Sequence, residues 1–113
     1  MKKLRIYEDA LRLVRLCRPH WEALEKGGHP DLARQMKRCV PLVALNITEG
    51  AWRYDGNARQ RFKTAIGSAR ETIGCLDVGG AMGVLAAGEV AEAVDCADKV
   101  IATLWKMLRR SRA

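Results

Sequence analysis

Apolar residues recur every three or four positions along almost the whole chain, which is the spacing of one face of an α-helix. Glycine-containing breaks at Gly27-Gly28, at residues 50–57 and at Gly88 divide this pattern into four stretches. No stretch shows the strict alternation that a half-buried strand requires. The pattern therefore predicts an all-α fold, an antiparallel up-down-up-down four-helix bundle, built as a single domain over residues 1–113.

The second and third stretches contain residues that are unusual inside helices. Pro41 interrupts the second stretch, but the apolar spacing continues across it, so we expect one bent helix. Asn57 precedes the third stretch and is suited to cap it. The third stretch is rich in glycine, including Gly67, Gly74 and Gly79, and each glycine costs roughly 1 kcal/mol relative to alanine in a helix. We expect another helix backbone to approach closely at these positions.

The first and fourth stretches are apolar over more than one row. In the first stretch we expect one row to face the core, consisting of Tyr7, Leu11, Val14, Trp21 and Leu24. A second row is expected to flank it, consisting of Ile6, Ala10, Leu13 and Cys17. Further apolar positions in the two stretches include Trp21, Ala93, Val100 and Trp105. Because a bundle buries one stripe per helix, the additional rows predict self-association.

Composition is that of a folded, soluble protein. Of 113 residues, 49% are hydrophobic and 29% are charged, which excludes whole-chain disorder. The longest stretch without a charge, residues 78–88, is far too short to cross a bilayer. Lys2, Lys3 and Arg5 are followed by Glu8 and Asp9, which interrupt any signal-peptide segment. We therefore expect a cytoplasmic protein with no membrane partner.

Neither the cysteines nor the histidines have the spacing of a metal site. The four cysteines are Cys17, Cys39, Cys75 and Cys96, and no two form a C-x-x-C pair. They are expected to be reduced, apolar core residues. His20 and His29 do not follow a glutamate by three residues, as di-iron bundles require. We expect no metal and no cofactor.

Polar residues within the apolar rows leave two interpretations open. Asn46 and Glu49 lie near the end of the second stretch, and Ser68 and Glu71 share a face of the third. The two carboxylates could act as an acid/base pair, or they could belong to a buried polar network that fixes helix register. The second interpretation is favoured, because no histidine joins them. With no catalytic triad and no phosphate-binding loop, we expect no catalytic residue and no enzyme activity.

The net charge of +7 favours a polyanionic partner. Basic residues cluster in several segments, and the candidate phosphate contacts are Lys2, Lys3, Arg5, Arg12, Arg15, Arg59, Arg61, Lys63, Arg109, Arg110 and Arg112. The alternative is that these side chains form only a solvated face. Trp52, Arg53 and Tyr54 could stack on exposed bases or could close the end of the bundle. The sequence thus indicates a basic surface that is distributed along the chain.

Two motifs resemble those of a known family. Asn46-Ile47-Thr48-Glu49-Gly50, Phe62, Ala65-Ile66-Gly67-Ser68 and Glu71 resemble the four-helix bundle protein family, also called the 23S ribosomal RNA intervening-sequence proteins. The hallmark of that family is N-I-x-E-G followed by A-x-G-S-x-x-E. The residues that match this motif, and to which the resemblance gives a structural role, are Asn46, Glu49, Gly50, Gly67, Ser68 and Glu71.

The resemblance implies a ring-like homopentamer of antiparallel four-helix bundles. Members of the family occur within ribosomal RNA gene insertions. A related branch, the accessory variability determinant proteins of diversity-generating retroelements, binds nucleic acid and a reverse transcriptase. We therefore expect a non-catalytic homo-oligomer that binds structured RNA or an RNA-DNA intermediate, with a reverse transcriptase as a further candidate partner. The alternative is a protein-protein scaffold or accessory subunit that does not contact nucleic acid.

Overall fold

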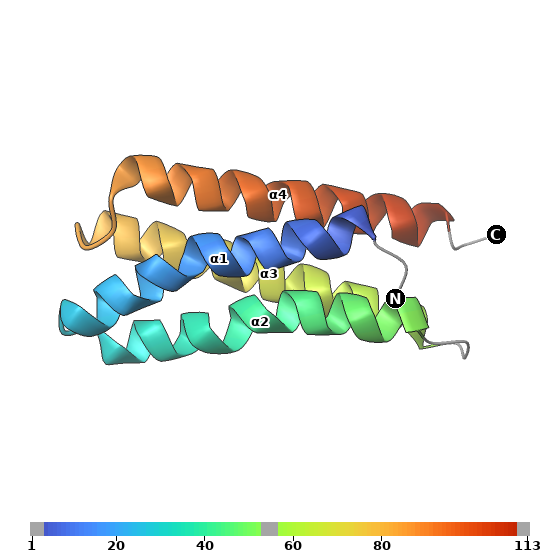
Figure 1. Cartoon of the computed structure of the whole chain (residues 1–113), viewed down its shortest axis with the longest axis horizontal. Helices are drawn as coiled ribbons and strands as arrows, with labels where there is room; N and C mark the ends of the chain where they lie inside the picture. The colour runs from blue at the N-terminus through green and yellow to red at the C-terminus, as the bar shows by residue number, and fades with distance from the viewer. Residues whose placement is uncertain (1–3, 53–56, 111–113) are drawn as a thin grey trace.

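The computed structural model describes residues 4–52 and 57–110, and within them the chain forms four α-helices and no strand (Figure 1). The helices are α1 (Arg5–Lys26), α2 (Pro30–Trp52), α3 (Ala58–Ala81) and α4 (Ala87–Arg110). They lie side by side in a body 46 Å long and 21 Å across. Each of α1 and α3 packs against both α2 and α4. The prediction of an all-α fold with four helices is confirmed.

The connections between helices lie at the two ends of the molecule. The turn from α1 to α2 and the turn from α3 to α4 share one end, and α2 ends and α3 begins at the other (Figure 1). In the first two turns, Gly28 has φ +87° and Gly83 has φ +76°. L-residues with side chains rarely adopt this left-handed conformation, so glycine suits both turns. The break at Gly27-Gly28 therefore corresponds to a real helix end, whereas the break expected at Gly88 lies earlier, at Gly83, and Gly88 is within the first turn of α4.

The two prolines inside helices do not end them. Pro41 lies within α2, which is one continuous helix as expected, and Pro19 lies within α1.

The prediction that Asn57 caps the start of α3 through its side chain is wrong. Asn57 occupies the N-cap position, but its side chain makes no capping hydrogen bond. Its backbone, at φ −93° and ψ −2°, is already helical, whereas a capping residue is usually extended.

In α1 the row that was expected to flank the core is the row that faces it. Ile6, Ala10, Leu13 and Cys17, expected to flank the core, are buried together with Leu24. Tyr7, Leu11, Val14 and Trp21 are only half-buried. Because α1 packs between α2 and α4, the row with two small side chains faces the bundle axis. On α4, Ala93 and Val100 are also core residues, so they do not form an additional surface for self-association.

The glycines of α2 and α3 fall into two groups. A Cβ atom on Gly50 would lie 2.6 Å from the ring of Phe62, and one on Gly79 would lie 2.5 Å from Cδ1 of Leu85. By contrast, a Cβ on Gly67 or Gly74 would have no neighbour within 4 Å. The expected approach of another helix backbone is therefore wrong within the chain. Two of these glycines make room for apolar side chains, and two lie open on the surface of α3.

Candidate nucleic-acid interface

The charged residues of the bundle are segregated between its two ends. We define the basic end as the half of each helix nearest the point where α2 ends and α3 begins, which comprises residues 4–15, 42–52, 57–69 and 99–110. The remaining described residues, 16–41 and 70–98, form the opposite end. Among the described residues, the basic end carries ten basic and three acidic side chains, and the opposite end carries six basic and nine acidic. The basic surface is distributed along the chain but is concentrated in space.

All the described candidate phosphate contacts lie at the basic end, but they do not form one patch. Arg59 and Lys63 on α3 lie beside Arg109 on α4. Arg12 instead pairs with Glu92 of α4 at 3.1 Å, and Arg15 lines a separate hollow with Glu89 and Glu92. The candidates Arg5, Arg61 and Arg110 are also exposed or half-buried at this end. Lys2, Lys3 and Arg112, like Arg53 and Tyr54, lie outside the described residues.

The two ends differ in how their cations are paired. At the opposite end four of the six basic side chains form ion pairs, which are Arg18–Glu22, Arg34–Asp31, Lys37–Glu25 and Arg38–Glu71. At the basic end Lys63, Lys106, Arg109 and Arg110 have no ion pair among the described residues. Local acids therefore neutralise most cations at the opposite end. These four cations of the basic end therefore have no acidic partner among the described residues that an external anion would have to displace.

The densest group of cations at the basic end surrounds a tryptophan. Arg59, Lys63, Trp105, Leu108 and Arg109 line a hollow of about 410 Å³ between α3 and α4, and none of the described residues that line it is acidic. Arg59 Nη1 donates a hydrogen bond of 2.5 Å to the Leu108 carbonyl, which fixes the start of α3 against the last turns of α4. The Trp105 side chain is 38% exposed. We call these five residues the Trp105 hollow.

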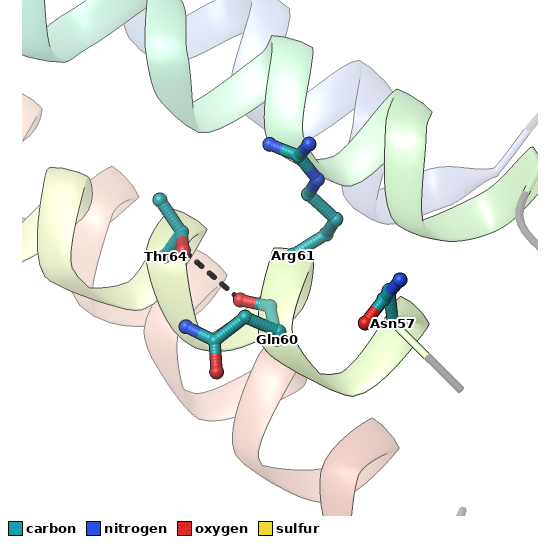
Figure 2. Close-up of a pocket in the computed structure, with 4 residues that line it drawn as sticks. All are labelled: Asn57, Gln60, Arg61 and Thr64. Atoms are coloured by element: carbon teal, nitrogen blue, oxygen red, sulfur yellow. Dashed lines mark hydrogen bonds between the residues drawn. The ribbon is translucent and has the colours of Figure 1, made fainter. Parts of the chain in front are cut away.

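A second, polar hollow lies at the start of α3, on the side that faces α2. Asn57, Gln60, Arg61 and Thr64 line it (Figure 2). The Arg61 side chain extends toward α2, where its Nη2 lies 3.4 Å from Oε1 of Glu49. Thr64 Oγ1 donates a hydrogen bond of 3.0 Å to the Gln60 carbonyl, so it is satisfied within its own helix. Arg61 therefore links α2 to α3, in addition to carrying charge.

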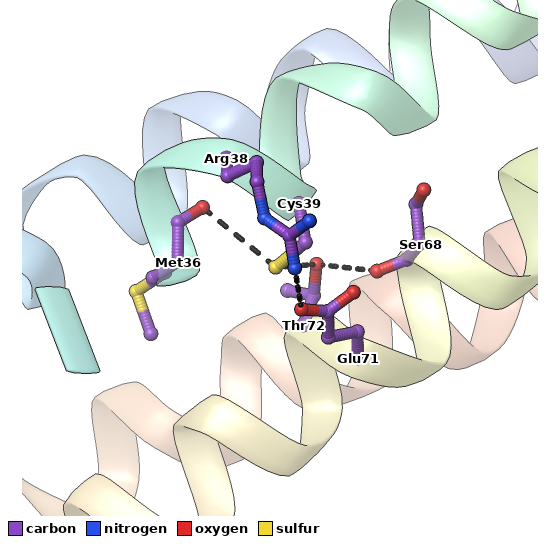
Figure 3. A network of polar contacts seen from close by, with 6 residues as sticks. All are labelled: Met36, Arg38, Cys39, Ser68, Glu71 and Thr72. Atoms are coloured by element: carbon purple, nitrogen blue, oxygen red, sulfur yellow. Dashed lines mark hydrogen bonds and ion pairs between the residues drawn. The ribbon is translucent and has the colours of Figure 1, made fainter. Parts of the chain in front are cut away.

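The two motif carboxylates do not form the network or the pair that the sequence suggested. Glu71 accepts a hydrogen bond of 2.9 Å from Arg38 of α2 (Figure 3), and Glu49 pairs with Arg61. Both carboxylates are more than 40% exposed, so neither lies in a buried network. Arg38 and Glu49 are eleven residues apart on α2, which is about 16 Å along a helix. Their partners Glu71 and Arg61 are similarly separated, so no acid/base pair of Glu49 and Glu71 forms.

The buried side chains of Asn46, in the motif, and of Thr72, next to it, bond within their own helices instead. Asn46 Nδ2 donates a hydrogen bond of 2.8 Å to the Leu42 carbonyl. Thr72 Oγ1 donates one of 2.9 Å to the Ser68 carbonyl and lies 3.4 Å from Sγ of Cys39 (Figure 3). The motif therefore has a structural role in three ways. Asn46 bonds within its own helix, Gly50 leaves room for the ring of Phe62, and Glu49 and Glu71 form exposed ion pairs that link α2 to α3.

Each helix contributes one buried cysteine to the interior. Burial raises the pKa of the Cys17 thiol to about 12 and also raises the pKa of Cys96. A hydrogen bond with Cys75 lowers the pKa of Cys39 to about 7, and the same bond raises the pKa of Cys75.

Among the described residues no three His, Cys, Asp or Glu side chains are placed to hold a metal ion. None of the described helices is long and apolar enough to cross a membrane.

Sequence reasoning named the cations that line the Trp105 hollow as candidate phosphate contacts but assigned Trp105, which lies among them, to self-association. The signal was present as two pairs at i, i+4 spacing, Arg59/Lys63 and Trp105/Arg109. Each pair marks one face of its helix. That the two faces adjoin depends on how α3 packs on α4, which helical spacing alone does not determine.

Comparisons with known proteins place the chain in a family. The family model described as 23S rRNA-intervening sequence protein matches residues 2–106. Among solved structures, the bundle is similar to a protein of unknown function from the S23 ribosomal protein family of Bacteroides thetaiotaomicron VPI-5482. That similarity has a TM-score of 0.83 at 14% identity, over 91% of this chain and 97% of the other, and it shows a shared fold. No curated protein matches the sequence. With nearly the whole length matched, the chain belongs to the 23S rRNA-intervening sequence protein family.

Proposed function

We propose that this chain is a non-catalytic nucleic-acid-binding protein whose basic end contacts the phosphates of structured RNA or of an RNA-DNA intermediate. The observation that carries the proposal is the segregation of charge, with Lys63, Lys106, Arg109 and Arg110 forming no ion pair among the described residues of the basic end. Such cations bind phosphates without reading base sequence. The description of the family as intervening-sequence proteins of ribosomal RNA is consistent with an RNA partner.

The start of α3 supports this proposal, because its charges oppose helix stability. Its first turn contains Arg59 and Arg61 and no acidic residue, and the side chain of its N-cap residue Asn57 makes no capping hydrogen bond. Cations near a helix N-terminus are unfavourable by about 0.3–1 kcal/mol each at the surface. By contrast, α2 and α4 begin with Asp31 and Glu89. A phosphate bound at this end would attract both the positive helix N-terminus and the two arginines, and it would thus offset their mutual repulsion.

We also propose that the antiparallel bundle assembles as a homopentamer through the α2/α3 face. This face exposes Leu42 and Leu45 on α2 and Val78 on α3, next to the open glycines Gly67 and Gly74. Glycines inside a helix destabilise it, and at these positions a neighbouring subunit could use the room for close packing. Assembly would gather five copies of the net charge of +7 on one particle.

Fluorescence anisotropy with labelled ribosomal RNA fragments tests the nucleic-acid proposal. At low salt we expect binding that weakens steeply as salt rises, because bound phosphates release their counterions. A logarithmic plot of the association constant against salt should be linear, with a slope near −0.7 for each phosphate contact on single strands. Lack of binding even at low salt would reject the proposal.

Sedimentation equilibrium tests the assembly independently. A pentamer of the 12.6-kDa chain has a mass of about 63 kDa. The substitution Gly67→Leu should lower the mass to that of a monomer, because it fills the room proposed for the neighbour. Ala102→Leu, which adds the same side chain at an exposed position of α4, lies away from the α2/α3 face and should leave the mass unchanged. A wild-type monomer would contradict the proposal.

A protein-protein scaffold is the second candidate function, and the exposed apolar residues of the α2/α3 face favour it. In that case the face would bind a different protein, and a reverse transcriptase is the partner that the family resemblance suggests. Binding of a purified reverse transcriptase that persists at high salt, together with no nucleic-acid binding, would favour the scaffold.

A further inference from the structure

We propose that the Trp105 hollow is a subsite for an unpaired nucleobase, with the neighbouring phosphates of a single strand held by Lys63 and Arg109. This inference rests on the proposed nucleic-acid function and deepens it from a charged surface to a defined site. It also places base stacking at Trp105, whereas the sequence offered Trp52, Arg53 and Tyr54 as residues that either stack on bases or close the end of the bundle.

The hollow combines two kinds of group that together suit a nucleotide. The exposed part of the Trp105 indole offers a flat apolar surface, and Leu108 beside it is buried and closes the hollow. Arg59, Lys63 and Arg109 surround this apolar surface with positive charge, and the part of the lining that the structure describes contains no carboxylate. Its volume of about 410 Å³ falls within the range of roughly 300–1,000 Å³ typical of small-ligand sites.

The placement of these groups is fixed by helix packing. Lys63 follows Arg59 by one turn of α3, and Arg109 follows Trp105 by one turn of α4. The hydrogen bond from Arg59 to the Leu108 carbonyl joins the two faces. Because Arg59 is committed to this contact, Lys63 and Arg109 are the cations that remain to bind phosphate. The site therefore exists before any ligand binds.

Alternative anionic partners satisfy only part of this site. An acidic peptide would neutralise the cations, but most acidic segments offer the indole no flat ring. A nucleic-acid duplex presents phosphates but keeps its bases stacked inside. An unpaired nucleotide places a flat ring on the indole and a phosphate on each side of it, as in proteins that bind single strands by stacking.

Anisotropy with a labelled 12-nucleotide oligouridylate tests the subsite. Trp105→Leu should weaken binding roughly five- to 150-fold, which corresponds to the loss of one stacked base. Trp105→Phe keeps an aromatic ring and should restore most of the affinity. The matched control is Trp52→Leu, because Trp52 is 50% exposed at the same end but is not part of the hollow. This variant should bind as the wild type does.

Inorganic polyphosphate, which has charge but no bases, separates the two proposals. It should compete with oligouridylate for the cations, and its own affinity should be the same for wild type and Trp105→Leu. Equal binding of oligouridylate by these two proteins would overturn the base subsite while leaving the phosphate surface intact. A changed oligomeric mass in Trp105→Leu would also overturn it, because Trp105 would then belong to a subunit contact. Failure of the wild type to bind any oligonucleotide would reject the proposed function itself.

Discussion

The two ends of this bundle share one helical framework but use their charged residues differently. At the opposite end most cations face acids one helical turn away or on the next helix, as in Arg34–Asp31 and Arg38–Glu71. At the basic end the cations near α4's last turn have no such acids among the described residues. Exposed ion pairs contribute only about 0–1 kcal/mol each, so the fold does not depend on either arrangement.

This difference shows which charges are available for binding. A cation that already has an acidic neighbour must give up that partner to bind an external phosphate. No acid among the described residues competes in this way for Lys63 or Arg109, and both also adjoin Trp105. We therefore place the proposed nucleic-acid surface at the basic end and treat the opposite end as a structural counterpart. The following predictions each compare a change at one end with a matched change elsewhere.

The largest difference should come from reversing charge at each end. The double variant K63E/R109E should weaken RNA binding by roughly 100-fold or more at low salt, because each lost charged hydrogen bond contributes about 1.5–3 kcal/mol. The control K26E/R70E changes the net charge equally at the opposite end, and its two cations also lack an ion pair among the described residues. It should weaken binding only a few-fold through long-range attraction. Equal losses in titrations of the two variants would show that only net charge matters.

The next effect concerns the glycine that makes room for an apolar side chain at each end. Gly50→Ala would press a methyl group into the rigid ring of Phe62, and we expect a loss of about 1–3 kcal/mol in the free energy of unfolding. Gly79→Ala meets the end of the flexible Leu85 side chain, which can rotate, so its loss should be smaller.

Gly67→Ala is the control for both glycine variants. A methyl group at Gly67 meets nothing within 4 Å, and the monomer should gain about 0.5–1 kcal/mol from helix propensity. Urea unfolding of the three variants, at a concentration where the chain is monomeric, measures the series. A more harmful effect of Gly79→Ala than of Gly50→Ala would contradict the packing that we describe.

The buried thiols, all of which belong to the opposite end, should make the fold sensitive to alkali. The folded pKa of Cys17 is raised from 9.0 to about 12, so the folded protein keeps a proton that the unfolded chain loses. Stability through this group is constant below pH 9 and falls above it, by about 1.4 kcal/mol at pH 10. Cys39, with its lowered pKa of about 7, acts in the opposite direction between pH 7 and 9.

The variant Cys17→Ala isolates the contribution of Cys17. It should be less stable than the wild type at pH 8, because it leaves a small cavity, but it should lose less stability between pH 9 and pH 10. Urea unfolding at the three pH values measures both effects. Parallel losses in the two proteins would show that Cys17 does not contribute to the pH dependence.

The smallest effect should come from the first turns of α3 and α4. Gln60→Glu places an acid near the N-terminus of α3, and we expect a gain of about 0.3–1 kcal/mol in stability together with weaker RNA binding. Glu89→Gln removes the acid at the matching position of α4, and it should lower stability by a similar amount without changing binding. Thermal unfolding measures the stability of the two variants, and fluorescence anisotropy measures their RNA binding. If Gln60→Glu left binding unchanged, the start of α3 would not belong to the interface.

Much of the fold could be predicted from the sequence because helical spacing and glycine-containing breaks are local signals. The four helices and the continuity of α2 through Pro41 follow from them. The core row of α1 could not be chosen correctly, since two adjacent apolar rows satisfy the same spacing. The choice depends on the directions from which α2 and α4 approach.

The candidate site was predicted in its residue types but not in its geometry. Arg59, Lys63 and Arg109 were identified as phosphate contacts, whereas Trp105 was assigned to self-association. The sequence also suggested that Glu49 and Glu71 could meet. The register between α2 and α3 separates them, because Arg38 and Arg61 each take one carboxylate. Register between helices is a tertiary property that neither motif encodes locally.

Photo-crosslinking of an RNA that contains 4-thiouridine, followed by mass spectrometry of the peptides, tests the central claim most directly. We predict crosslinks in residues 57–69 and 99–110, where α3 begins and α4 ends, with Trp105 among the modified positions. These crosslinks should disappear in K63E/R109E and persist in K26E/R70E. Crosslinks confined to residues 16–41 and 70–98 would contradict the account, because the nucleic acid would then bind at the opposite end.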